Sequence, residues 1–146
     1  MTLPRPQRII APSPLGSLLK RAGVPTRQRI SPEERNPDYL ALVRQCPCLR
    51  CGHDPAGVAA HLRLNSALHN KRQAMGRKPA DCWVTPLCAG CHTNDQDAQH
   101  RIGELAFWDR LGINPFLACE RLYARSGDLV AMRAVVFAII GDRRMA

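Results

Sequence analysis

Two C-x-x-C pairs constrain this chain more than any other feature of its sequence. Cys48 and Cys51 form the first pair, and Cys88 and Cys91 form the second. Each pair places two thiolates in one tight turn, and four thiolates complete the tetrahedral coordination of a zinc ion. The spacing therefore predicts one structural Zn²⁺ ion, bound by these four cysteines.

Cys46 leaves the identity of the first ligand open. The run C-P-C-L-R-C allows Cys46 to bind the metal in place of Cys48. Cys48 is favoured because C-x-x-C is the usual zinc turn, and because the following Gly52 lets the backbone fold over the metal. Cys82 has strand-forming neighbours and Cys119 has helix-forming neighbours, so both are interpreted as small buried apolar residues.

The cysteine pattern also indicates a cellular compartment. The N-terminus is rich in proline and contains no apolar run of the kind found in secretory signals. Paired C-x-x-C spacing without such a signal favours zinc in a reducing cytoplasm over disulfide bonds. The most apolar run, residues 129–140, is interrupted by Arg133 and is too short to span a bilayer, so no membrane association is expected.

Charge indicates the class of partner. The chain of 146 residues has a formal net charge of +9, and only three of its 21 basic residues are lysines. Arginine presents a planar fork that pairs with phosphate through two hydrogen bonds, whereas lysine acts as a point charge. A basic, arginine-rich domain therefore favours nucleic acid as the partner.

Residues 1–30 differ in composition from the rest of the chain. Proline and arginine alternate there with small apolar residues, and no helical or strand period persists. The pattern predicts a basic, disordered arm that contacts phosphates without reading sequence, and a linker with no partner is the alternative. An ordered domain is expected over residues 31–146.

Local signals within that domain predict an α+β fold. Ser31 and Asn36-Pro37 are both typical of a helix start. Either start predicts a short helix that ends near Gln45. Two strands are expected over residues 57–62 and 82–87, with a loop between them. Helical structure is expected from Ala89 onward, and Ser126 is the expected cap of the last helix. The later helices are predicted over residues 97–111 (ending at Gly112), 114–124 and 126–141.

Three stretches carry a family resemblance. They are A-A-H-L, which contains His61, then P-L-C-A-G-C-H, which ends at His92, and Q-H-R-I-G-E-L-A-F-W, which contains His100. In this order the chain resembles the HNH, or His-Me finger, endonucleases, and it is most similar to a phage and prophage branch that includes the phage recombination-enhancement nucleases. The resemblance covers about residues 39–116.

The resemblance implies a small, zinc-stabilised ββα-metal domain that hydrolyses DNA phosphodiester bonds. In this family His61 is the general base, and His92 and His100 hold one catalytic divalent cation such as Mg²⁺. DNA is the implied partner, with a recombinase filament on DNA implied for this branch. These roles agree with the chemistry, since a neutral imidazole accepts a proton from water and a divalent cation stabilises charge on the phosphate.

The sequence also departs from the family pattern. Many HNH sequences have a metal-binding Asp or His directly before the general base, where this chain has Ala60. The family's asparagine in the second strand is missing as well, and its nearest equivalents are Trp83 and Asp81. Asp81 supplies the lost carboxylate, orients His61, or is merely a turn residue.

Glu104 is the other carboxylate in the candidate site. It lies one helical turn after His100 on the predicted helix, where it orients His100, binds the metal, or remains a solvated carboxylate. The first of these roles is favoured. Because of Ala60, the alternative function is a non-catalytic zinc module that binds nucleic acid or protein through a decayed HNH site.

The loop between the predicted strands is basic. We expect its cations to form a phosphate-contacting surface beside the site, with an ordinary solvated loop as the alternative. The nucleic-acid-binding candidates are Arg63, Lys71, Arg72, Arg77 and Lys78.

Overall fold

The computed structural model describes residues 35–145 of the chain. The predicted basic arm and the predicted helix start at Ser31 lie outside the described residues. The helix start at Asn36 lies within them and is confirmed, because the Asn36 side chain accepts a hydrogen bond of 3.0 Å from the backbone N–H of Tyr39. Pro37 occupies the first turn of this helix, α2 (Pro37–Arg44).

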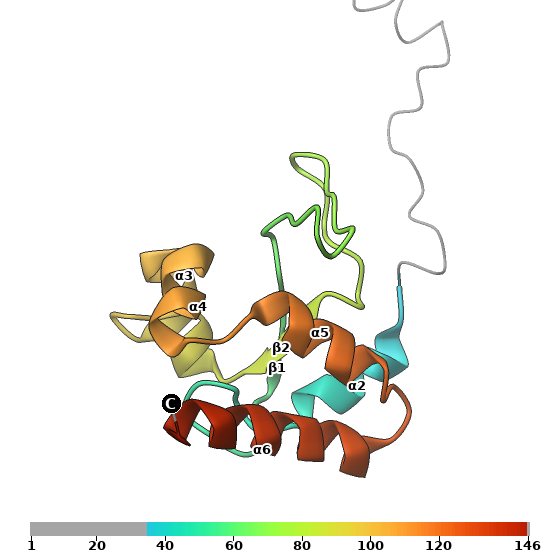
Figure 1. Cartoon of the computed structure of the whole chain (residues 1–146), viewed down its shortest axis with the longest axis vertical. Coiled ribbons are helices and arrows are strands. Elements are labelled where there is room, and N and C mark those ends of the chain that lie inside the picture. The colour runs from blue at the N-terminus through green and yellow to red at the C-terminus, as the bar shows by residue number, and fades with distance from the viewer. Residues whose placement is uncertain (1–34, 146) are drawn as a thin grey trace, which may run out of the picture. The chain divides into compact units, whose positions relative to one another are not determined.

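A two-stranded antiparallel sheet forms the centre of the fold, which confirms the predicted α+β class (Figure 1). In the sheet, β1 (Val58–His61) pairs with β2 (Val84–Leu87), so that Val58 faces Leu87 and His61 faces Val84. After β2 comes a single π-helical turn, η2 (Gly90–Asn94). The remaining elements are α3 (Gln99–Ile102), α4 (Glu104–Leu111), α5 (Pro115–Tyr123) and α6 (Leu129–Met145).

The hydrophobic core joins the sheet to the helices that follow it. Tyr39 and Val43 of α2 are buried with Leu87 of β2, and Leu122 of α5 and Val136 of α6 belong to the same buried cluster. Removing this much apolar surface from water is the main source of stability for a sheet of only two strands. The C-terminal helices therefore complete the core around the strands.

The predicted helix over residues 97–111 is divided in two, which corrects that expectation. Gly103 has a φ of +88°, a backbone conformation that ends α3, and α4 starts at the next residue. Glycine adopts such angles easily because it has no Cβ atom. As a result, His100 and Glu104 lie on separate helices and do not share the face expected of one continuous helix.

The last helix also begins and ends later than predicted. Asp128, rather than Ser126, caps α6, because its Oδ1 atom accepts a hydrogen bond of 3.0 Å from the backbone N–H of Ala131. The helix continues beyond Gly141 to Met145. Across residues 35–145, no helix has both the length and the apolar character needed to cross a membrane.

Candidate active site and metal centre

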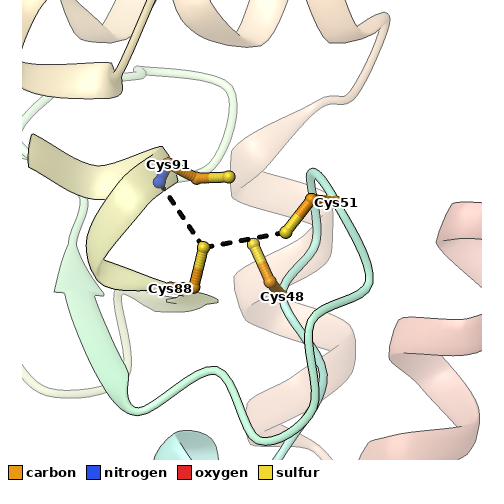
Figure 2. Close-up of side chains that lie close together, drawn as sticks. All are labelled: Cys48, Cys51, Cys88 and Cys91. Carbon is orange, nitrogen blue, oxygen red and sulfur yellow. Dashed lines mark hydrogen bonds between the residues drawn. The ribbon is translucent and has the colours of Figure 1, made fainter. Parts of the chain in front are cut away.

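The four predicted zinc ligands meet at one point, with their sulfur atoms all within 4.8 Å of one another. Figure 2 shows the four side chains converging from two turns, and the Sγ atoms of Cys51 and Cys88 are 3.6 Å apart. A tetrahedral zinc ion with Zn–S bonds of about 2.3 Å places its sulfur ligands roughly 3.8 Å apart. The donor set and its spacing therefore fit a structural zinc ion.

Both turns of the metal centre direct backbone N–H groups at sulfur. The N–H of His53 donates to the Cys51 sulfur at 3.5 Å, and the N–H of Cys91 donates to the Cys88 sulfur at 3.5 Å. Gly52 closes the first turn with a φ of +78°, a conformation that glycine adopts easily. This agrees with the prediction that Gly52 lets the backbone fold over the metal. Hydrogen bonds of this kind stabilise thiolates, the form in which cysteine binds metal.

The structure separates Cys46 from the metal centre. Its thiol is buried and donates a hydrogen bond of 3.5 Å to the carbonyl oxygen of Leu42. Burial raises the pKa of Cys46 to about 11, which favours the neutral thiol. Cys119 is also fully buried, as predicted, with its thiol 3.3 Å from the carbonyl oxygen of Val84.

We expect the Cys46→Ser protein to retain one zinc ion per chain and the Cys48→Ser protein to lose it. Of these two cysteines, Cys48 alone belongs to the four-sulfur cluster, so the replacement of Cys48 removes a ligand and the replacement of Cys46 does not. Metal analysis of the two purified variants measures the difference. Zinc retained in Cys48→Ser and lost in Cys46→Ser would assign the ligand to Cys46 instead.

Arg50, which lies inside the first C-x-x-C pair, was not anticipated from the sequence. Its guanidinium donates to the Cys91 sulfur at 3.7 Å and forms ion pairs with Asp95 and Asp97. Four thiolates around Zn²⁺ leave two excess negative charges, and a neighbouring guanidinium offsets part of that charge. Arg50 thus connects the metal centre to the segment that leads from η2 to α3.

His61 and Asp81 form the first of two close pairs that involve the predicted site histidines. His61 is the last residue of β1, and its Nε2 atom lies 2.8 Å from Oδ1 of Asp81. Asp81 is 2% exposed and also accepts hydrogen bonds from the backbone N–H of Asn36 at 2.9 Å and from Arg35 at 3.0 Å. The structure therefore places Asp81 where it orients His61, rather than in an isolated turn.

The electrostatics of this pair keep the aspartate charged and the histidine neutral. Burial raises the pKa of Asp81, but hydrogen bonds from His61, Asn36 and Arg35 outweigh that effect and hold the pKa below its usual value. Burial lowers the pKa of His61, and the hydrogen bond to Asp81 offsets only part of this. An ionised carboxylate only accepts hydrogen bonds, so Nε2 of His61 carries the proton and Nδ1 keeps a free lone pair.

His92 and His100 form the second pair. Their Nε2 atoms lie 2.9 Å apart, although His92 belongs to η2 and His100 to α3. Two imidazoles bound at a right angle to a cation, with bonds of about 2.1 Å, have nitrogen atoms roughly 3.0 Å apart. The distance is that of a hydrogen bond between the two rings, and it also matches two adjacent ligands in an octahedral site.

Glu104 occupies a different place from the one expected. Its carboxylate accepts hydrogen bonds from the backbone N–H groups of Arg63 at 2.9 Å and Leu64 at 3.0 Å. Within residues 35–145, no hydrogen bond joins Glu104 to His100. Glu104 therefore fixes the chain as it leaves β1, and the expectation that it orients His100 is corrected. Ala60, beside His61, is 1% exposed and belongs to the core.

The basic loop is exposed at Arg63, Arg72, Arg77 and Lys78, but Lys71 is an exception. Lys71 is 3% exposed, and its ammonium group donates a hydrogen bond of 2.6 Å to the carbonyl oxygen of Leu64. The expectation that Lys71 belongs to an exposed phosphate-contacting surface is therefore corrected. The chain turns at Asn70, and a β-bridge pairs Ser66 with Lys71. This turn brings Lys71 under the loop.

Comparisons of the chain with protein-family models, curated proteins and solved structures found no match. Membership of the HNH family stays a prediction from the sequence motifs.

Proposed function

We propose that this protein is a metal-dependent endonuclease of the HNH type that hydrolyses phosphodiester bonds in DNA. The observation that carries the proposal is the hydrogen bond of 2.8 Å between His61, at the end of β1, and the buried carboxylate of Asp81. A structural zinc site needs no such pair. The His92–His100 pair adds a site with the spacing of two cation ligands.

In this proposal His61 acts as the general base on the attacking water. The Nδ1 lone pair accepts the water proton, and Asp81 holds the ring in place and stabilises the imidazolium that forms. Arg35 in turn balances the charge of Asp81 through their 3.0 Å ion pair. His92 and His100 would hold a divalent cation, which would supply stabilisation of charge on the scissile phosphate and the leaving oxygen.

A specific observation favours the alternative function, a non-catalytic zinc module with a decayed site. Ala60 stands where many HNH sequences have a metal ligand, and its methyl group is buried in the core. Among residues 35–145, His92 and His100 are then the two proposed protein ligands for the catalytic cation. Two imidazoles are a poor ligand set for Mg²⁺, which prefers oxygen ligands, so water and phosphate oxygens would have to complete such a site.

The metal requirement of cleavage tests the proposal. We expect His100→Ala to raise the concentration of Mn²⁺ needed for half-maximal cleavage, with activity partly restored at high Mn²⁺, because one of two ligands is lost. Arg110→Gln, an exposed change on α4, is the matched control and leaves that concentration unchanged. Identical Mn²⁺ dependence in His100→Ala and the unaltered protein would remove His100 from the cation site.

The pH dependence of cleavage follows from His61. The neutral imidazole is the active form, so the rate falls as pH drops through the pKa of His61, which burial places below the ordinary value of about 6.5. We therefore expect the acid limb of the pH–rate profile to lie below pH 6.5. Asp81 raises this pKa, so Asp81→Asn moves the limb to still lower pH, besides slowing cleavage. An acid limb above pH 6.5 would contradict the assignment.

A further inference from the structure

The second half of the loop between the strands lines an open cavity of about 120 Å³. Four cationic side chains contribute to its lining, and Trp83 and Pro79 add apolar surface. The cationic residues are Lys71, Arg72, Arg77 and Lys78. In a small cavity that combines several cations with an aromatic ring, the cations can bind the phosphate of a nucleotide and the ring can stack against its base.

Lys71 gives this cavity a buried positive charge that Glu104 offsets only from a distance. Its ammonium group has one hydrogen bond, to Leu64, and within residues 35–145 no carboxylate forms an ion pair with it. Burial accordingly lowers the pKa of Lys71. A buried charge without an ion pair is costly, and an anionic ligand that enters the cavity reduces that cost.

The cavity is linked to the His61–Asp81 pair through residues of its lining, although neither member of the pair lines it. Its wall includes Pro79, whose carbonyl oxygen accepts a hydrogen bond of 3.0 Å from the same Arg35 nitrogen that pairs with Asp81. Lys78, another residue of the lining, lies close enough for its charge to lower the pKa of His61. A phosphate in the cavity therefore lies near the proposed general base.

Trp83 determines which form of nucleic acid fits. It is partly exposed and lines the cavity, and its ring centroid lies 6.0 Å from the Lys71 ammonium nitrogen. A base in duplex DNA is already stacked between its neighbours, so it cannot reach an aromatic ring in a cavity of this size without leaving the helix. An unpaired nucleotide has no such constraint.

We propose that this cavity binds one unpaired nucleotide of the nucleic-acid substrate, with the phosphate toward Lys71 and Arg72 and the base against Trp83. This inference rests on the proposed nuclease function. A cavity of this kind favours substrates that contain a single-stranded segment beside the cleavage point. It also gives the buried Lys71 a role that an exposed phosphate-contacting loop does not require.

Binding measurements on the full chain carrying His61→Ala, without added Mg²⁺ or Mn²⁺, test the proposal. The probes are a fluorescent 12-nucleotide thymidylate strand and the same strand paired with its complement. We expect Lys71→Met and Trp83→Leu each to weaken single-strand binding about 10-fold and to leave duplex binding within about 2-fold. Trp83→Phe keeps an aromatic ring and retains most of the single-strand affinity. Arg110→Gln removes an exposed charge on α4 that does not line the cavity, and we expect it to change the affinity for both probes by the same small factor.

Zinc content and melting temperature identify any variant that fails to fold, and Arg72→Gln replaces Lys71→Met in that case because Arg72 is exposed. Equal losses for single strand and duplex, or no loss in folded variants, would overturn the proposal. Heparin competing as well as unlabelled single strand would also overturn it, by showing general attraction of polyanions. Selective single-strand binding without any cleavage would sustain this inference and refute the nuclease function, so the two fail separately.

Discussion

Replacement of His61 by alanine lowers the rate of DNA cleavage about 10²–10⁴-fold, the contribution typical of a positioned general base. Zinc content stays near that of the unaltered protein, because His61 lies outside the four-sulfur cluster. DNA affinity also stays near that of the unaltered protein, because the ring of His61 contacts Asp81. Cleavage rate, zinc content and melting temperature are measured on the same preparations.

His53→Ala is the matched control for this prediction. His53 is an exposed histidine beside the metal centre, and only its backbone N–H contacts Cys51. Its replacement leaves cleavage unchanged. If His61 were only a core histidine, its replacement would lower the melting temperature first and activity in step with it. Full cleavage by a stable His61→Ala protein would refute the proposed mechanism.

Replacement of Cys88 by serine releases the zinc ion and unfolds the centre of the domain. Structural zinc sites in small domains contribute roughly 10–16 kcal/mol of binding free energy to folding, which is comparable to or larger than the whole stability of a typical domain, about 5–15 kcal/mol. Cys88 supplies one of the four ligands and receives the backbone hydrogen bond from Cys91. Metal analysis and circular dichroism spectra measure the two effects.

Cys82→Ser is the control for the loss of a ligand. Cys82 is a half-buried cysteine that lies outside the four-sulfur cluster, so its replacement keeps one zinc ion per chain and costs little stability. A Cys88→Ser protein that remained folded without zinc would show that the metal centre does not stabilise the fold.

The metal centre and the sheet followed from the sequence because their signals are local. A C-x-x-C pair forms its turn from four consecutive residues, and Gly52 marks that turn in the sequence itself. The strands and the start of α2 likewise depend on short patterns, such as Asn36 before Pro37. The approach of Cys48 and Cys51 to Cys88 and Cys91 was predictable because a single tetrahedral ion requires it.

The errors arose where tertiary contacts decide the outcome. Periodicity predicted one helix through Gly103, but Glu104 instead starts a new helix and binds the backbone of Arg63 and Leu64, about forty residues earlier. Lys71 appeared to be an exposed loop cation, yet the chain turns at Asn70 and buries its side chain. Gly103 and Asn70 mark the two backbone turns in the sequence, but the partners that Glu104 and Lys71 reach after those turns are set by tertiary contacts.

Incubation of the zinc-loaded protein with supercoiled plasmid, with and without added Mg²⁺ or Mn²⁺, tests the nuclease proposal most directly. The plasmid carries regions that open into single strands under negative supercoiling, so it offers both forms of DNA. The account predicts nicked or linear plasmid only when the cation is added, and no product with the His61→Ala protein. An intact plasmid after incubation with folded, zinc-loaded protein and either cation would contradict it and favour the non-catalytic zinc module.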